Sequence, residues 1–355
     1  MRDIFESTID SMLGDLVTPA LFRLCADGTW PAQLWDAIED GEFPCAMVPE
    51  TLGGSGATWD DTYVLIRAAG SHAVPAPLAD TLLANWVLGR VGIHPMKGPT
   101  SVAAHAAVTC ANGRATGLAE NIPWGRHLKH IVIVSKDEDP SVLVLDTASA
   151  AEVEHRSNVA GEPRDNLRFH HARVVHAVRL PENLSADLLL FGGAMIRSAQ
   201  IAGALQSLLQ MTATYATERI QFGKPIGHFQ VIQQQIALLA EHTASTLLAA
   251  EAAFAEAADD LSPLPVMAAK ICAGEAASVA ASIAHAVHGA IGFTDEHSLH
   301  LKTRRLWAWR AEYGSQTYWS QRLGRRICAS GAAALWPTLT QSSAMNSTTV
   351  MESAS

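Results

Sequence analysis

The sequence contains little charge and no concentration of basic residues. Charged residues make up only 17% of the 355 residues, whereas hydrophobic residues make up 48%. The formal net charge is −10, and lysine and arginine do not gather into a polybasic run. Proteins that bind nucleic acid mainly through phosphates need a basic surface. The composition therefore argues against nucleic acid as a partner.

Paired cysteines and long apolar runs are also missing. No C-x-x-C pair occurs, and the five cysteines lie far apart, at Cys25, Cys45, Cys110, Cys272 and Cys328. This spacing predicts reduced thiols, not a disulfide framework or a zinc site. No stretch reaches the roughly 18 uninterrupted apolar residues of a membrane-spanning helix. The N-terminus has acidic residues at Asp3, Glu6 and Asp10, where a signal peptide would be apolar. We therefore expect a cytoplasmic protein without a membrane span.

The pattern of apolar residues changes twice along the chain. Helical spacing comes first and is broken by the glycine-rich stretch PETLGGSG. Short β-branched runs such as HIVIV and SVLVLD follow, and long helical runs then return. We predict an α+β, mainly α fold with an N-terminal helical domain (1–95), a small middle β-domain (96–182), a C-terminal four-helix bundle (183–337) and a disordered tail (338–355).

One break between two predicted bundle helices has an unusual composition. The stretch ATERIQFGKPIGHFQ brings together Arg219, Phe222 and Gly223 just before a long apolar helix. A guanidinium group is a fork-shaped donor that suits a pyrophosphate. An arginine at a helix end also suits the helix dipole and often has no further role. The stretch by itself leaves both interpretations open.

The motif R-x-x-F-G-x-P-I-x-x-F-Q, from Arg219 to Gln230, resembles the most specific motif of the flavin-dependent acyl-CoA dehydrogenases. The segments VPETLGGSG (48–56) and HGAIGFTDEH (288–297) resemble two further parts of that family, and the order of helices, β-domain and helices is similar to its three-part fold. The similarity covers roughly residues 5–330. The chain looks most like the smaller subunits that pair with a full-length dehydrogenase in bacterial breakdown of steroid and bile-acid side chains.

This resemblance implies FAD bound across a dimer interface, an acyl-CoA substrate, and an electron-transfer flavoprotein or similar acceptor. In the family a glutamate removes the α-proton of the substrate, while a hydride leaves its β-carbon for the flavin. Arg219 and Phe222 would reach the pyrophosphate and adenosine of a flavin held mainly by the neighbouring subunit. The resemblance assigns four further residues to the cofactor side: Gln221, Gln230, Gly289 and Ser315.

The chain departs from the family at the positions that perform the chemistry. Pro123 stands where the resemblance expects a threonine that hydrogen-bonds the flavin ring, and proline has no N–H or hydroxyl to donate. The two positions that the family uses for its base hold Tyr313 and Gly193. A tyrosine, with an ordinary pKa of about 10, is a poor base at neutral pH. Glu312 is the remaining catalytic candidate, but it lies one residue away from the base position.

Three hypotheses follow from these departures. In the first, the chain is the non-catalytic partner in an α2β2 FAD-dependent dehydrogenase, a heterotetramer that introduces an α,β double bond into a bulky acyl-CoA such as a steroid side chain. In the second, it is a self-sufficient homotetrameric dehydrogenase that uses Glu312 as its base. In the third, it is a flavin-free scaffold, although the retained Arg219 weighs against that. We favour the first, because the chain lacks the expected residues both at the base positions and at Pro123, where the resemblance expects a contact to the flavin ring.

Two other patterns suggest ligands but have simpler explanations. The histidines at 285, 288, 297 and 300 form two H-x-x-H pairs, which could indicate zinc. Without a nearby cysteine cluster we favour packed or surface histidines and predict no metal site. The segment KTRRLWAWRAEYG is basic and interleaved with tryptophan. At helical spacing, Trp307 and Arg310 are expected to pack and pair at a subunit interface, not to stack on nucleic acid.

Overall fold

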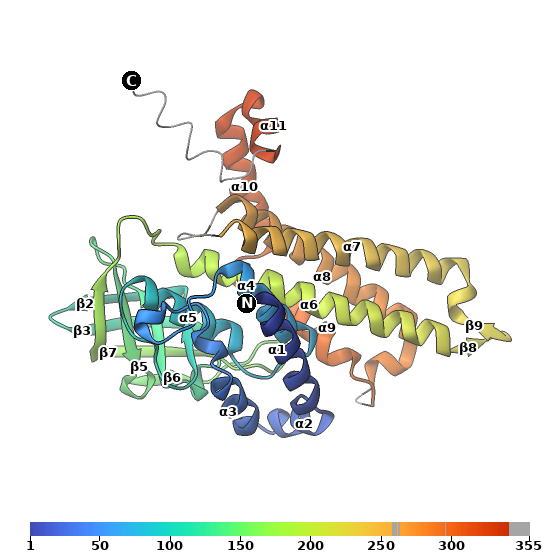
Figure 1. Cartoon of the computed structure of the whole chain (residues 1–355), viewed down its shortest axis with the longest axis horizontal. Helices are drawn as coiled ribbons and strands as arrows, with labels where there is room; N and C mark the ends of the chain where they lie inside the picture. Colours follow the sequence, from blue (N-terminus) through green and yellow to red (C-terminus); the bar gives the residue numbers. More distant parts are fainter. Residues whose placement is uncertain (258–260, 262, 295, 341–355) are drawn as a thin grey trace.

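The structure is a computed structural model, which describes residues 1–257, 261, 263–294 and 296–340. Helices form the first part of the chain, a sheet follows, and long helices complete it (Figure 1). The sheet lies at one end of the elongated molecule, and α6 and α7 extend to the other end. The predicted fold class, α+β and mainly α, is confirmed.

Among the N-terminal helices, α5 is the most deeply buried. This helix is buried from Leu78 to Leu88 and packs against β1, α4 and α6. α4 begins at a capping box, in which the hydroxyl of Thr58 accepts the Asp61 N–H and the Asp61 carboxylate accepts the Thr58 N–H, both at 3.1 Å. The helices are α1 (Arg2–Leu16), α2 (Pro19–Ala26), α3 (Ala32–Asp40), α4 (Trp59–Ser71) and α5 (Leu78–Arg90), with short 3-10 turns at Phe43–Cys45 and Glu50–Leu52.

The middle of the chain forms one seven-stranded sheet in the order β1-β4-β5-β7-β3-β2, with β6 also paired to β7. β1 and β4 are parallel and the other pairs are antiparallel. The 16-residue strand β7 joins the two halves of the sheet, and its first residues, Arg164–Asn166, are buried. The strands are β1 (Thr100–Val102), β2 (His105–Ala111), β3 (Arg114–Pro123), β4 (His130–Val134), β5 (Ser141–Asp146), β6 (Glu152–Glu154) and β7 (Arg164–Arg179).

Three long helices dominate the C-terminal part. α6, α7 and α8 pack on one another, and α10 packs against α8. A small hairpin of β8 and β9 joins α6 to α7 at the far tip of the molecule (Figure 1). The elements are α6 (Leu188–Glu218), β8 (Ile220–Gln221), β9 (Lys224–Pro225), α7 (Gln230–Ala255), α8 (Pro263–His288), α9 (Leu299–Trp309), α10 (Gln316–Ser330) and α11 (Ala332–Thr340), with 3-10 turns at Ile226–His228 and Gly289–Phe293.

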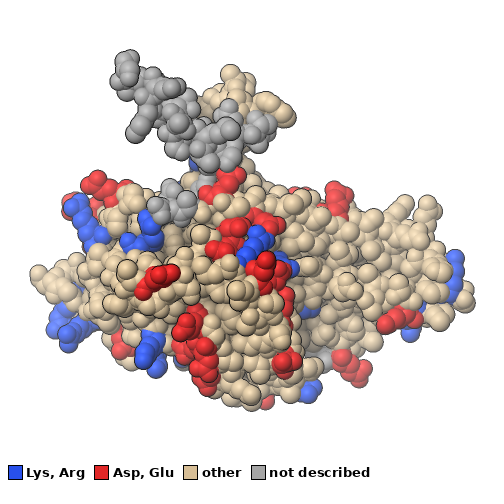
Figure 2. All heavy atoms as spheres, viewed as in Figure 1, with Lys and Arg blue, Asp and Glu red and all other residues tan. Residues whose placement is uncertain are grey.

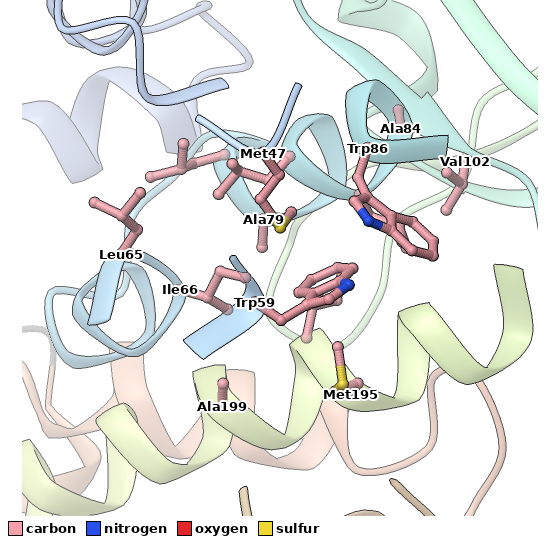
Figure 3. Close-up of a cluster of buried hydrophobic side chains, with 14 of the residues drawn as sticks. Met47, Trp59, Leu65, Ile66, Ala79, Ala84, Trp86, Val102, Met195 and Ala199 are labelled. Atoms are coloured by element: carbon pink, nitrogen blue, oxygen red, sulfur yellow. The ribbon is translucent and has the colours of Figure 1, made fainter. Parts of the chain in front are cut away.

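α4 and α6 cross at very short distance because glycines face the other helix at the contact. A Cβ atom on Gly70 would lie 2.0 Å from the carbonyl oxygen of Gln200, and one on Gly203 would lie 1.9 Å from that of Arg67. Next to this crossing, Trp59 and Trp86 meet with their ring centroids 5.1 Å apart, close to Met195 of α6 (Figure 3). This apolar cluster joins the N-terminal helices to α6.

Two long helices are apolar enough in composition to resemble membrane spans. Residues 188–218 and 263–293 are long and apolar enough to cross a membrane by composition, but 94% and 61% of their most apolar windows are buried inside the protein. Such burial is typical of core helices of a bundle.

α11 continues to Thr340, so the first residues of the predicted tail are helical, and residues 341–355 lie outside the described residues. The exact domain boundaries remain a prediction.

Candidate functional site

The motif that starts at Arg219 forms the hairpin between α6 and α7. α6 ends where the N–H of Arg219 donates to the carbonyl of Tyr215 at 2.9 Å. Ile220 then pairs with Pro225, and Phe222 and Gly223 make the turn with φ angles of 52° and 80°. A bulky residue in this left-handed region is uncommon outside tight turns. The turn therefore fixes Phe222 at the tip of the β8–β9 hairpin.

Phe222 and Arg219 are both directed to the outside. The side chain of Phe222 is 92% exposed and contacts Phe229 edge-on, with the centroids 6.0 Å apart. The Arg219 guanidinium is exposed and makes no ion pair or hydrogen bond with any residue that the structure describes. An uncovered aromatic ring and an unpartnered guanidinium in the same short segment form a surface that suits an external anionic and aromatic ligand.

Most of the other predicted cofactor residues lie at the same end of the molecule. Gln221 and Gln230 are exposed on the hairpin and at the start of α7. Gly289 ends α8 with a φ of 64°. It is close to α6, because the Tyr215 hydroxyl donates to the carbonyl of His288 at 3.3 Å. Ser315 is elsewhere: its hydroxyl accepts the N–H of Tyr318 at 3.2 Å and caps α10.

Glu312, the catalytic candidate, is held in a dense ionic network. One carboxylate oxygen accepts from Arg164 Nε at 2.8 Å and from Asn158 Nδ2 at 3.0 Å, and the other from Arg197 Nε at 2.8 Å and Arg164 Nη2 at 3.1 Å. Burial by itself would raise the pKa of Glu312, but the charges of Arg164 and Arg197 outweigh it and hold this pKa well below its usual range. A carboxylate in this state is a poor proton acceptor.

Tyr313 fills the space beside Glu312. It is 6% exposed with a φ of 52°, and its hydroxyl donates to Asp80 Oδ1 at 3.1 Å. Its ring lies against Gly193, where a Cβ atom would be 2.1 Å from Tyr313 Cδ1. Burial, and then the charge of Asp80, raise the pKa of Tyr313 well above its ordinary value. Tyr313 and Gly193, which the resemblance places at the base positions, therefore offer no group that accepts a proton at neutral pH.

Further buried charges hold this region together. Arg197 is paired to Asp80 at 2.9 Å, and Glu162 bridges Arg164 at 2.9 Å and Arg305 at 3.0 Å. Buried ionic groups are retained only when such partners compensate them. These contacts join α5, α6, α9 and the start of β7 around Glu312.

Lys270 of α8 holds the end of α9, just before the turn that contains Glu312. It is fully buried, and its Nζ donates to the carbonyls of Trp309 and Arg310 at 3.0 and 2.9 Å. These carbonyls end α9 and have no partner within that helix. Burial lowers the pKa of Lys270 to about 7. Lys270 therefore fixes the direction in which the chain leaves α9 and enters the turn with Glu312.

A cavity of about 400 Å³ opens between the sheet and the end of α9. The strands contribute Val102, His105 and Pro123, and α9 with the following turn contributes Trp307, Ala311 and Tyr313. The segment from Arg156 to Val159 closes a third side. Arg164 and Glu312 also line it, and both are already paired. One wall of the cavity thus carries ions that are already paired with each other, Arg164 and Glu312, and other parts of the lining are apolar.

The hairpin and the cavity are far apart on one chain. Arg197, which binds Glu312, and Arg219 are both positioned by α6 and lie 22 residues apart in the chain. At 1.5 Å per residue this separation is about 33 Å. The residues of the hairpin therefore cannot contact a group that reacts beside Glu312 of the same chain.

The histidines and the tryptophan segment have packing partners within the protein. His285 stacks on Phe293 with centroids 4.4 Å apart, and His288 stacks on Tyr215 at 4.5 Å. In the part of the chain that the structure describes, no group of three or more His, Cys, Asp or Glu residues could hold a metal ion. Arg310 lies 4.0 Å above the ring of Trp307 as a cation–π pair.

Comparison with known proteins agrees with this architecture. The sequence model of the acyl-CoA dehydrogenase C-terminal domain matches residues 190–327. The chain is 28% identical to the acyl-CoA dehydrogenase IpdE2 of Mycobacterium tuberculosis over 308 residues, which cover 86% of this chain and 90% of that protein. Residues 190–327 thus match the acyl-CoA dehydrogenase C-terminal domain, and the chain is similar to acyl-CoA dehydrogenases over most of its length. The predicted family and the oxidoreductase class are thereby confirmed.

Solved structures show the same fold over nearly the whole chain. The ChsE4–ChsE5 complex from Mycobacterium tuberculosis superposes with a TM-score of 0.84 at 22% identity, covering 92% of this chain and 97% of that chain. The Tcur3481–Tcur3483 steroid acyl-CoA dehydrogenase, a variant, superposes with a TM-score of 0.82 at 22% identity, covering 93% and 98%. At these identities the likeness concerns the fold.

FAD is the cofactor that the family resemblance implies, and the chain fits only one end of it. The free guanidinium of Arg219 and the uncovered ring of Phe222 suit its pyrophosphate and adenosine. The cavity does not suit its ring system. Pro123 has no N–H, and the N–H of Trp124 already donates to the carbonyl of Pro163 at 2.9 Å. The end of β3 therefore has no free backbone donor at these two residues for the polar edge of a flavin.

Sequence reasoning missed the residues that surround Glu312. Arg164, Arg197, Asp80 and Asn158 were not among the predicted site residues, although they determine the state of Glu312. A usable signal existed for Arg197, which interrupts an otherwise apolar run of α6. A single charge inside an apolar helix is rarely buried without a partner, so this arginine indicates a buried ionic contact.

Proposed function

We propose that the chain is the non-catalytic partner subunit of an α2β2 FAD-dependent acyl-CoA dehydrogenase. The holoenzyme would introduce an α,β double bond into a bulky acyl-CoA, with a steroid side chain as the favoured substrate class. FAD, when bound, supplies the acceptor for the hydride that leaves the β-carbon. This chain would lend Arg219 and Phe222 to a cofactor held by the larger subunit, in the cytoplasm, and an electron-transfer flavoprotein or similar protein would accept the electrons.

One observation carries the proposal. The residues that suit a cofactor, Arg219 and Phe222, lie on an exposed hairpin, about 33 Å along α6 from the level of Glu312. A residue at such a tip cannot serve a group that reacts beside Glu312 of the same chain, but it is exposed to a ligand that another subunit presents. At the other end, Glu312 is paired with Arg164 and Arg197, and Tyr313 stands at a position that the family resemblance assigns to the base. The chain therefore keeps two residues that suit a cofactor but has no residue that could act as the base at the positions that the family resemblance assigns to it.

The comparisons support the substrate class and the heteromeric assembly only by analogy. The Tcur3481–Tcur3483 protein is described as a steroid acyl-CoA dehydrogenase of two named chains, and ChsE4–ChsE5 is a complex of two named chains. The alternative of a self-sufficient homotetramer that uses Glu312 as base has little support, because that carboxylate accepts four hydrogen bonds.

The proposal is tested by expressing the chain alone and together with a candidate larger acyl-CoA dehydrogenase subunit from the same organism. We expect flavin absorption only in the co-purified complex, at less than one FAD per chain, because this chain has no complete site of its own. Purification of a yellow protein from this chain alone, active on an acyl-CoA, would refute the proposal and favour the homotetramer. A colourless, inactive complex of the two chains would instead favour a flavin-free scaffold.

A further inference from the structure

The cavity beside Glu312 has no role in the proposed function, yet it is open and about 400 Å³ in volume. Small-molecule sites in proteins usually have roughly 300–1,000 Å³ and combine apolar walls with a few polar groups. The cavity falls within this range. A subunit that does not hold the flavin ring could have filled this volume with larger side chains, but small residues such as Ala104, Ala308 and Ala311 line it.

The buried polar wall of the cavity has no binding capacity left. The Arg164 guanidinium donates to Glu162, to Glu312 and to the carbonyl of Pro163. Asn158 donates to Glu162 and Glu312 and accepts the N–H groups of Ala160 and Glu162. A ligand with many donors and acceptors, such as a flavin, would leave its own polar groups unpaired against this wall, which is unfavourable in a buried place.

The exposed edge of the cavity, its rim, differs from the buried wall because it has polar side chains without partners in the part of the chain that the structure describes. Arg156 is exposed at the rim, and its guanidinium makes no ion pair or hydrogen bond with any described residue. The hydroxyl of the adjacent Ser157 also has no protein partner among the described residues. Glu120, the carboxylate of the rim, is the direct cross-strand neighbour of His105. Arg156 is therefore the cation of the lining that remains available to a ligand.

We propose that this cavity binds a compact apolar anion, with the apolar body among Val102, Ala308 and Tyr313 and the carboxylate or sulfonate on Arg156 and Ser157. The ligand is not a flavin and no chemistry occurs on it, because Glu312 is already paired. The apolar walls favour a ring system or branched chain by excluding water, and the single free guanidinium favours one negative charge. This site lies in the cavity, not at the hairpin that carries the proposed function.

The test compares 2-naphthoate with 2-naphthamide, which has nearly the same shape but no charge. Both are titrated by calorimetry into the full-length chain in its purified assembly. We expect saturable binding of naphthoate, one per copy of this chain, and binding of the amide at least about tenfold weaker. An ionic hydrogen bond of about 1.5–3 kcal/mol corresponds to a factor of about 10–100 in affinity.

Two variants locate the site. Arg156→Gln should weaken naphthoate about 10–100-fold and leave the amide within about threefold, so that the two ligands bind alike. Ala311→Trp, on the exposed part of the lining, should abolish binding of both by filling the cavity. The matched controls are Arg173→Gln, an exposed arginine of β7, and Ala111→Trp, about 20 Å along β2 from His105. Both controls should bind as the wild type does.

Three results would overturn the proposal. The first is binding of the amide as tight as that of the acid, which would remove the anionic preference. The second is naphthoate binding that neither cavity variant changes, which would place it elsewhere. The third is release of bound FAD from the chain by naphthoate, which would make flavin the occupant. Should Ala311→Trp fail to fold, Arg156→Gln decides alone, because it changes an exposed side chain.

Discussion

The ring of Tyr313 lies directly on Gly193, so close that a Cβ atom at residue 193 would be 2.1 Å from Tyr313 Cδ1. The family resemblance places its two alternative bases at these two positions. Their replacements therefore depend on each other: the tyrosine ring needs the missing side chain of the glycine. Restoring a carboxylate at residue 193 alone would collide with the ring.

We predict that Gly193→Ala destabilises the protein by about 1–3 kcal/mol or more, which is typical of an overpacked core. The second variant, Tyr313→Gly, removes the ring and suits the φ of 52° at that position. Urea unfolding of both single variants and the double variant measures the coupling between them. In the double variant the cost of Gly193→Ala should largely disappear. An additive double variant would show that the two residues do not compete for space.

Glu312→Gln should lower the free energy of unfolding by about 2–4 kcal/mol, because it removes the counter-charge that the buried Arg164 and Arg197 share and leaves each with one other carboxylate. This figure lies near the lower end for buried pairs, since the Glu312 side chain is 16% exposed. The measurement is urea unfolding at pH 7. Glu152→Gln is the matched control, because Glu152 pairs with Arg168 on the surface with 73% exposure, and it should change little.

The same variant should change the acid limb of the stability curve. The pKa of Glu312 is held below its usual range in the folded protein, so the unfolded chain binds more protons as the pH falls. The stabilisation from this group is fully present above the unfolded pKa of about 4.3 and is lost as the pH falls towards the folded pKa. The difference between wild type and Glu312→Gln should therefore shrink from pH 6 to pH 3. A constant difference would argue against the ionic network.

Much of the fold followed from local pattern, whereas the state of Glu312 did not. The change from helical to β-branched spacing and back predicted the fold class, and the hairpin lies where Gly223 and Pro225 broke the helical run. The partners of Glu312, Arg164 and Arg197, are 148 and 115 residues away in the chain. Contacts at such separations depend on how the sheet and bundle pack, and no local periodicity encodes them.

Arg219→Ala should reduce the FAD content of the co-purified complex. Loss of a charge-assisted hydrogen bond of about 1.5–3 kcal/mol corresponds to a loss in affinity of about 10–100-fold. Flavin absorption per protein after gel filtration measures it, and free FAD in the buffer should restore part of the content. Lys224→Ala in the same hairpin is the control, because Lys224 lies over Phe229. Full FAD content in Arg219→Ala would exclude this residue from the cofactor site.

Lys270→Met should flatten the alkaline rise of stability. The pKa of Lys270 is lowered to about 7 by burial, whereas an unfolded lysine titrates near 10.4. Between these values the unfolded chain binds more protons than the folded protein. The free energy of unfolding of the wild type should therefore rise as the pH increases from 7 to about 10. Thermal unfolding at several pH values measures this slope. A variant with the wild-type slope would show that Lys270 is not the group responsible.

The last prediction concerns assembly: the chain should be aggregated or unstable without its partner. The outer side of α7 and the adjoining hairpin expose a set of large apolar side chains, and Figure 2 shows few charged groups on this part of the surface. The set is Ile220, Phe222, Val231, Leu238 and Leu248. Apolar surface of this kind on a soluble protein usually marks an interface, and obligate interfaces are the most apolar.

Light scattering after gel filtration separates the outcomes. The wild-type chain alone should elute as aggregate, whereas the co-expressed complex should be monodisperse. Leu238→Glu together with Leu248→Glu should make the lone chain more soluble and should weaken the complex, because the same carboxylates that favour water on an exposed helix are costly in an apolar interface. Leu24→Glu is the matched control, since Leu24 is 44% exposed on α2, outside the α7 surface. A monodisperse monomer of the wild-type chain at micromolar concentration would contradict the prediction, and a complex unaffected by the paired glutamates would place the interface on another surface.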